Sequence, residues 1–141
     1  MSSLNDFNDQ IIAEFHANEG RVGGMFEGAS VLLLHHTGAK SGQSRINPLV
    51  FQSDDGRYVV FASKAGAPTN PDWYHNLKAH PDTSIEVGTD TIDVVASEAT
   101  GDERDRLFDA QVQRAPTFAE YAEKALPRII PVILLTPVAS A

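Results

Sequence analysis

The pattern of apolar and polar residues predicts a chain of short strands and four helices. Apolar residues first recur at steps of three and four over residues 4–17, which is the spacing of an amphipathic helix. Similar patterns predict helices at 71–79, from 101 to about 114, and after Pro116. Apolar runs bounded by turn residues predict strands at 31–34, 46–51, 58–62, 84–87, 91–96 and 129–135.

Turn residues join several of these strands into hairpins. Ser53-Asp54-Asp55-Gly56 separates the second and third strands, and Gly88-Thr89-Asp90 separates the next pair. Short strands with hairpin connections favour an antiparallel, barrel-like sheet over a parallel one, so we expect an α+β fold. We expect one domain over residues 1–141, with the N-terminal helix in 1–20 and the barrel in 31–137. Asn70 before Pro71 predicts a capped helix start.

Composition excludes several classes of function. The net charge of −8 argues against general affinity for nucleic acid or anionic lipid. There is no cysteine, and there is no apolar run of the length that spans a membrane. Because the first residues are polar and acidic, unlike a targeting peptide, we expect a cytoplasmic location. Residues 38–78 nevertheless carry five cations against three acids, so the middle of the chain is locally basic.

The basic region begins with Thr37-Gly38-Ala39-Lys40-Ser41-Gly42-Gln43-Ser44-Arg45. Gly38 and Gly42 can take positive φ values, which would let successive N–H groups converge on an anion. Lys40 and Arg45 can add charge-assisted hydrogen bonds. From these residues alone, an anion site and an ordinary Gly-rich turn fit equally well.

Two further segments combine small, polar and aromatic residues. Ser63 and Lys64 follow the strand that ends at Ala62, where they form either a ligand-binding loop or a solvated turn. The helix start after Asn70 can receive a phosphate, although Asp72 in its first turn opposes an anion. Trp73 shares a face of that helix with Tyr74 and Leu77, and core packing also explains all three.

The histidines have no metal-ligand spacing. His35 and His36 are neighbours on a strand and therefore point to opposite faces. We predict structural roles for most histidines and no metal site. No GxSxG motif or serine–histidine–acid grouping supports hydrolysis.

Three segments, TGAKSGQSRINPLVF, ASKAGAPTNPDWYHNLKAHP and RIIPVILLTP, together resemble the deazaflavin-dependent nitroreductase family. The match runs from about Val31 to Pro137. Members of this family are split antiparallel β-barrel oxidoreductases, of the FMN-binding split-barrel type, which use reduced coenzyme F420. The resemblance therefore implies a split β-barrel with surrounding helices and an F420H2-dependent oxidoreductase.

The resemblance also assigns site residues. It implies that the cofactor is bound by Lys40, Ser41, Arg45, Ile46, Asn47, Pro48, Leu49, Val50, Phe61, Ala62, Ser63, Lys64, Asp72, Trp73, Tyr74, His75 and Asn76. Ser63 is the first candidate catalytic residue, with Tyr74 and Tyr121 as weaker candidates. Ala115, Phe118 and Tyr121 match the substrate wall.

Departures from the family pattern shape the expected substrate. Ala39-Lys40 replaces an Arg-Lys pair, and only one of three phenols remains in the substrate wall. An apolar wall suits a quinone or another hydrophobic acceptor better than a nitroimidazole. An FMN-dependent oxidoreductase of the same fold and a non-catalytic deazaflavin carrier remain the alternatives. The N-terminal helix can cover the pocket, mediate a homodimer or contact a membrane peripherally.

Overall fold

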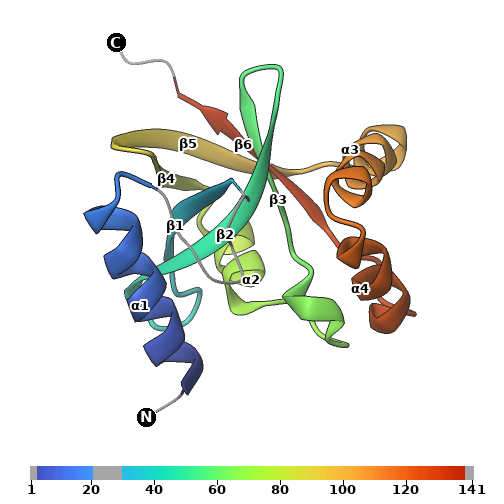
Figure 1. The fold of residues 1–141 in the computed structure, drawn as a ribbon, viewed down its shortest axis with the longest axis horizontal. Helices are drawn as coiled ribbons and strands as arrows, with labels where there is room; N and C mark the ends of the chain where they lie inside the picture. The colour runs from blue at the N-terminus through green and yellow to red at the C-terminus, as the bar shows by residue number, and fades with distance from the viewer. Residues whose placement is uncertain (1–2, 21–29, 139–141) are drawn as a thin grey trace.

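The computed structural model describes residues 3–20 and 30–138, without the side chains of 3–8 and of Ala65. Six antiparallel strands form a closed barrel in the order β1-β2-β3-β6-β5-β4 (Figure 1). The strands are β1 Val31–Thr37, β2 Ser44–Asp54, β3 Arg57–Phe61, β4 Asp82–Val87, β5 Asp90–Glu98 and β6 Val132–Pro137. The helices are α1 Ser3–Ala17, α2 Asp72–Ala79, α3 Gly101–Arg114 and α4 Thr117–Ala125, with a short 3₁₀ turn, η2 Lys64–Gly66. The predicted α+β barrel is confirmed.

The strand order sends all of the long connections to one end of the barrel. Asp55-Gly56 and Gly88-Thr89 are tight turns at the other end, and Asp55, Gly56 and Gly88 have the positive φ values that such turns need. The connections 38–43, 62–81 and 99–131 lie together, because each joins strand ends on the same side of the sheet. We call this side the connection end.

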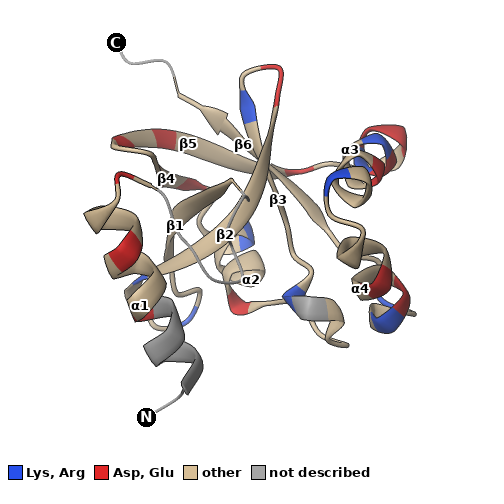
Figure 2. Ribbon diagram, in the orientation of Figure 1, with Lys and Arg blue, Asp and Glu red and all other residues tan. Residues whose placement is uncertain are grey.

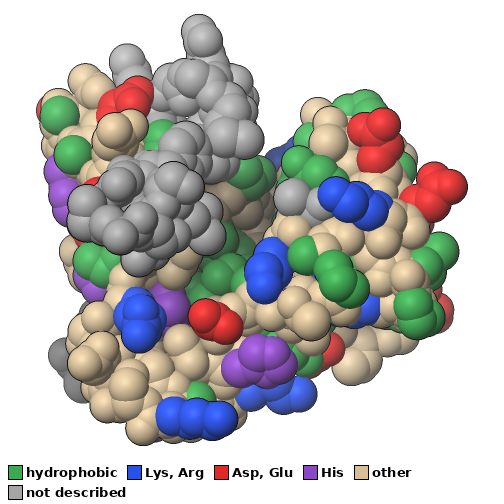
Figure 3. Space-filling model, turned by 90° about the horizontal axis from the view of Figure 1, so that it is seen from below, with side chains coloured by type: hydrophobic (Ala, Val, Ile, Leu, Met, Phe, Trp, Pro, Cys, Tyr) green, Lys and Arg blue, Asp and Glu red, His purple; other side chains and the backbone are tan. Residues whose placement is uncertain are grey.

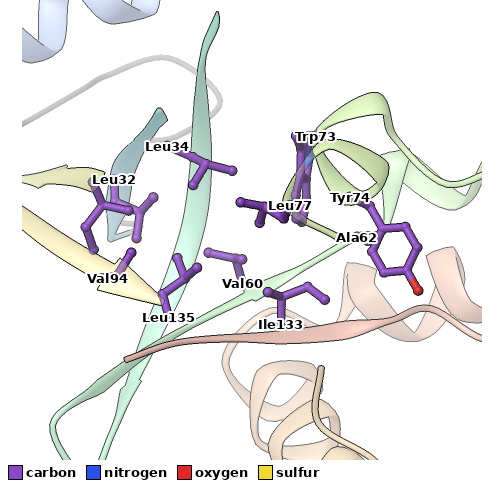
Figure 4. Close-up of a cluster of buried hydrophobic side chains, with 11 residues drawn as sticks. Leu32, Leu34, Val60, Ala62, Trp73, Tyr74, Leu77, Val94, Ile133 and Leu135 are labelled. Atoms are coloured by element: carbon purple, nitrogen blue, oxygen red, sulfur yellow. The ribbon is translucent and has the colours of Figure 1, made fainter. Parts of the chain in front are cut away.

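Every strand contributes apolar side chains to one cluster that fills the barrel interior. Leu34, Val60 and Leu135 are fully buried there, and they point toward one another (Figure 4). Trp73 and Leu77 of α2 pack on this cluster, so α2 closes the connection end of the barrel. Burial of these side chains is the main source of stability, at roughly 25 cal/mol per Å² of apolar surface.

Helices cover two parts of the outer surface. Phe61 of β3 points outward and packs with Phe108 of α3 and with α4. On the other side, α1 contacts β2 and buries Ile11 and Phe15. The outer face of β2 and β3 therefore lies between α1 and α4 (Figure 1).

A shared carboxylate also fixes α1 to the barrel. Glu86 of β4 accepts hydrogen bonds from His16 Nε2 of α1 (2.8 Å) and His35 Nε2 of β1 (2.7 Å). Partial burial acts to raise the pKa of Glu86, but these hydrogen bonds lower it below its ordinary value.

Several local expectations need correction. Strand β1 extends through both histidines because its pairing with β2 continues to Thr37 opposite Ser44. The last strand begins at Val132 rather than at Ile129. The cap of α2 is Pro71, which makes no side-chain capping bond, and Asn70 instead accepts a hydrogen bond from Arg128. No helix in the described ranges is long and apolar enough to cross a membrane.

We expect Leu34→Ala to lower the free energy of unfolding by about 3 kcal/mol, because it leaves a cavity in a closed barrel. Leu34 is 0% exposed, whereas Val95, also on a strand, is 39% exposed. Val95→Ala is therefore the control, with an expected loss under about 1 kcal/mol. Urea denaturation of both variants measures the difference, and equal losses would contradict the assigned core.

Candidate functional site

In the folded chain, some cations of the basic region 38–78 form salt bridges and others do not. Arg57 pairs with Asp54 (2.7 Å) at the hairpin end, and Lys78 lies 3.8 Å from Glu98. Lys40, Arg45 and Lys64 make no salt bridge with any residue in the described ranges. These three cations belong to the connection end, where Figure 2 shows basic residues on the β1–β2 loop and at η2. They leave positive charge available for a ligand.

The structure of the loop 38–43 differs from the anion cradle that its two glycines predict. Gly42 has the expected positive φ of 70°, but Gly38 does not; a Cβ on Gly38 would collide with Ser41 Oγ. The N–H groups of Gly38, Ala39, Gly42 and Gln43 all donate within the protein. The predicted convergence of these N–H groups on an anion is therefore wrong. The side chains of Lys40 and Arg45 are exposed, and their role as binding groups stays a prediction.

A buried polar network holds this loop in place. Asn76 of α2 accepts a hydrogen bond from the Ala39 N–H (2.9 Å) and donates to His36 Nδ1 (3.0 Å). His36 Nε2 in turn donates to Asn47 Oδ1 of β2 (2.7 Å). His36 is only 3% exposed, and burial lowers its pKa although its bond to Asn47 opposes the shift. The neutral ring matches its two partners, one acceptor and one donor.

The segment after β3 forms a strained turn against α4. Lys64 has φ 47° and Gly66 has φ 80°, and a Cβ on Gly66 would lie 2.9 Å from the Tyr121 carbonyl oxygen. Lys64 Nζ donates to Thr69 Oγ1 at 3.3 Å. Ser63 is half-buried, and its hydroxyl has no hydrogen-bond partner among the residues that the structure describes. That hydroxyl is therefore available to a bound molecule.

An apolar surface connects these two basic segments. The register points Ile46, Pro48 and Val50 of β2 outward on the α1 side, where Pro48 is buried and the other two are half-buried. On the α4 side, the ring of Phe118 lies 5.7 Å from Phe61 and 5.4 Å from Tyr121. Figure 3, viewed from the connection end, shows a hollow between the α1 side and the α3–α4 side, with hydrophobic side chains on its floor. We call this surface the apolar hollow.

The predicted run 46–50 divides between two faces of the sheet. Asn47 and Leu49 point into the barrel, opposite Leu34 and Leu32, and Ala62 is also buried inside. Only the alternate residues of this run can face the apolar hollow. Ala115 lies half-buried just before α4, and Ser41 is exposed on the loop.

The predicted residues of α2 also divide. Trp73, Tyr74 and Asn76 are buried, whereas Asp72 and His75 are exposed. The Tyr74 hydroxyl donates to Glu98 Oε1 at 2.7 Å, and burial together with this bond raises the pKa of Tyr74. The buried side chains thus close the barrel and support the loop, and they offer little surface to a ligand.

Sequence reasoning missed two supporting residues. His36 was expected to be structural, but its link through Asn76 to the loop backbone depends on contacts across three elements. The Arg128 side chain donates hydrogen bonds to the segment 62–70. The one signal for it in the sequence is that Arg128 is the first residue of RIIPVILLTP, a segment that resembles the family.

Solved structures of known proteins share this architecture. An F420H2-dependent reductase is similar with a TM-score of 0.68 and 40% identity, covering 74% of this chain and 92% of that protein. A protein described as a domain-swapped dimer is similar with a TM-score of 0.70 and 34% identity, covering 95% and 99%. A haem storage protein from Vibrio cholerae, at 18% identity and a TM-score of 0.59 with 94% and 92% coverage, shares the fold alone. The fold is that of the split-barrel proteins.

The sequence also matches a defined family. An F420H(2)-dependent quinone reductase of Mycobacterium tuberculosis is 39% identical over 128 residues, covering 88% of this chain and 85% of that protein. The model of the F420H(2)-dependent quinone reductase family matches residues 10–137. The chain belongs to this family.

The buried His36 predicts a defined dependence of stability on pH. Because its pKa is lowered in the folded chain, the unfolded chain binds a proton first as the pH falls through the ordinary value near 6.5. The free energy of unfolding should therefore drop from pH 7 toward the lowered pKa, and this slope should be smaller in His36→Gln. Urea denaturation at a series of pH values measures the difference. Equal slopes in the two proteins would contradict the buried, neutral assignment.

Proposed function

We propose that the protein transfers a hydride from reduced coenzyme F420 to a hydrophobic quinone, with activated alkenes and nitroaromatics as secondary acceptors. The family assignment makes it an F420H2-dependent oxidoreductase. The observation that carries the proposal is an apolar hollow at the connection end, the end that also carries Lys40, Arg45 and Lys64, three cations without a salt bridge in the described ranges. Such a surface suits a ligand with a flat ring system and an anionic extension.

The residues present fit this coenzyme. F420 has a phosphodiester and a polyglutamate tail, and an acidic protein repels such a polyanion except where cations are left unpaired. Lys40, Ser41 and Arg45 would hold the phosphate and tail, with Lys64 at the second segment. Ile46 and Val50, both half-buried, would line the ring system, with the buried Pro48 between them shaping the strand. When bound, the reduced deazaflavin supplies the hydride from its C5 carbon.

Ser63 is our first candidate for a group that acts on the acceptor. A quinone that gains a hydride carries negative charge on oxygen until it gains a proton, and a hydroxyl that donates a hydrogen bond there stabilises that charge. The Ser63 hydroxyl has no competing partner among the described residues. Tyr121 borders the hollow beside Phe118, and these rings would exclude water. Tyr74 is the weaker candidate because its hydroxyl already donates to Glu98.

Further predictions concern the alternatives and the partners. A carrier protein would bind F420 without oxidising its reduced form, and an FMN enzyme would not need the tail-binding cations. The cytoplasmic location and a peripheral membrane contact stay predictions. A homodimer is also proposed, supported by the similar protein that is described as a domain-swapped dimer.

Replacing Lys40 or Arg45 by alanine should weaken F420 binding about tenfold at low ionic strength, because each removes a charge-assisted contact to the anionic part. The loss should shrink at high salt, where the attraction is already screened. Fluorescence titration with F420 measures both effects. Arg57→Ala is the matched control, since it removes one cation from the same segment of sequence at the opposite end of the barrel. An equal loss in the control would contradict a local tail site.

Ser63→Ala should lower kcat for a quinone about tenfold to a hundredfold while leaving F420 affinity within about threefold. The hydroxyl is assigned to the acceptor and not to the coenzyme tail. Steady-state kinetics with a soluble quinone, together with the F420 titration, gives both values. An unchanged kcat would contradict the assignment of Ser63 as the group that acts on the acceptor. Tyr121→Phe is measured alongside it, because Tyr121 is the next candidate for that role.

A further inference from the structure

Arg128 makes the densest set of side-chain hydrogen bonds to the turn after β3. Nη1 donates to the Ala62 carbonyl (2.9 Å) and to Asn70 Oδ1 (2.7 Å). Nη2 donates to the Ser63 carbonyl (2.9 Å) and to the Ala67 carbonyl (2.7 Å), which Nε also reaches at 3.1 Å. One planar guanidinium therefore holds three backbone carbonyls and one amide oxygen of the segment 62–70.

This segment adopts an unfavourable backbone conformation, and few hydrogen bonds within it offset the cost. Lys64 and Gly66 both have positive φ values, and a non-glycine residue such as Lys64 adopts that conformation at a cost. Within the turn, Gly66 N–H donates to the Ser63 carbonyl (2.9 Å) and Ala67 N–H to the Lys64 carbonyl (3.0 Å). Because a guanidinium has a fixed fork of donors, Arg128 constrains the orientation of the peptides that it binds.

Arg128 also brings charge without a neighbouring acid. All of its acceptors are neutral oxygens, and it forms no salt bridge with any residue in the described part of the chain. The bond to the Ser63 carbonyl places this cation beside the residue whose hydroxyl is free. The same hydrogen bond therefore fixes the Ser63 peptide and places a positive charge beside it.

We propose that Arg128 is a positioning residue of the reductase, which fixes the Ser63–Lys64 turn so that the Ser63 hydroxyl faces the apolar hollow. The proposal rests on the proposed function for its catalytic meaning. Arg128 acts on the acceptor through Ser63, whereas Lys40 and Arg45 bind the coenzyme from a separate loop.

The ligand-free protein gives the first test. In Arg128→Lys, which keeps the charge and loses the planar fork, backbone amides of Gly66 and Ala67 should exchange with deuterium about tenfold faster or more. Asn70→Ala, which removes a single acceptor, should produce a smaller increase at the same amides. Arg104→Ala is the control, because Arg104 also donates to a backbone carbonyl, that of Ile130, without touching this segment. Unchanged exchange in both Arg128→Lys and Asn70→Ala would overturn the proposal.

The second test separates positioning from general destabilisation. Arg128→Lys should lower kcat for a quinone by about tenfold or more, up to the loss expected for Ser63→Ala, because it misplaces that group, with F420 affinity within about threefold. Parallel losses of kcat, affinity and folded protein, or wild-type kcat, would each overturn the positioning role. If the wild-type protein itself reduces no quinone, the proposed function fails. The hydrogen-exchange rates of Gly66 and Ala67 then still show whether Arg128 fixes the turn.

Discussion

Closure of the antiparallel barrel is the constraint on which the rest of the molecule depends. Once six strands pair in a ring, their ends alternate, and the tight turns and the long connections separate to opposite ends. The loop 38–43, the turn around η2 and the start of α4 are far apart in sequence, yet they reach the same end for this reason (Figure 1). The barrel interior is packed with apolar side chains, so we assign the ligand to the outer face of β2 and β3 between α1 and α4.

The hydrogen bonds that hold the connection end go to neutral acceptors, so the cations there are not paired with acids. His36 and Asn76 fix the first loop without using Lys40 or Arg45, and Arg128 fixes the second with neutral acceptors only. At the opposite end of the barrel, by contrast, Asp54 pairs with Arg106 and Arg57, which lowers the pKa of Asp54 to about 2. Buried polar groups in such networks are costly to leave unsatisfied, which keeps each loop in one arrangement. The backbone of both loops is therefore fixed before a ligand binds, and the cations on these loops have no salt bridge in the described ranges.

The sequence predicts the fold well because its signals are local. Alternating apolar residues and turn residues define the strands and hairpins, and their shortness indicates a barrel. The family resemblance was likewise correct.

The sequence does not predict which side chains face the site, because that depends on register: 46–50 divides into outward and inward residues, and the helix at 71–79 buries Trp73 and Asn76. The N–H groups of the first loop were predicted wrongly because acceptors within the loop take three of them and Asn76 takes that of Ala39. The Asn70 cap was predicted wrongly because Arg128 donates to the Asn70 side chain. Arg128 lies more than sixty residues from the carbonyls of Ala62 and Ser63, so no local pattern indicates its role.

The central claim is that the surface between α1 and α4 serves hydride transfer from reduced F420 to a quinone. The most direct measurement mixes the wild-type protein with reduced F420 and a soluble quinone without oxygen, and follows the absorbance of the oxidised deazaflavin. We predict catalytic turnover that requires both the protein and the quinone, and we predict that reduced FMN cannot take the place of reduced F420. Tight binding of F420 with no quinone-dependent oxidation would contradict the account and favour a carrier.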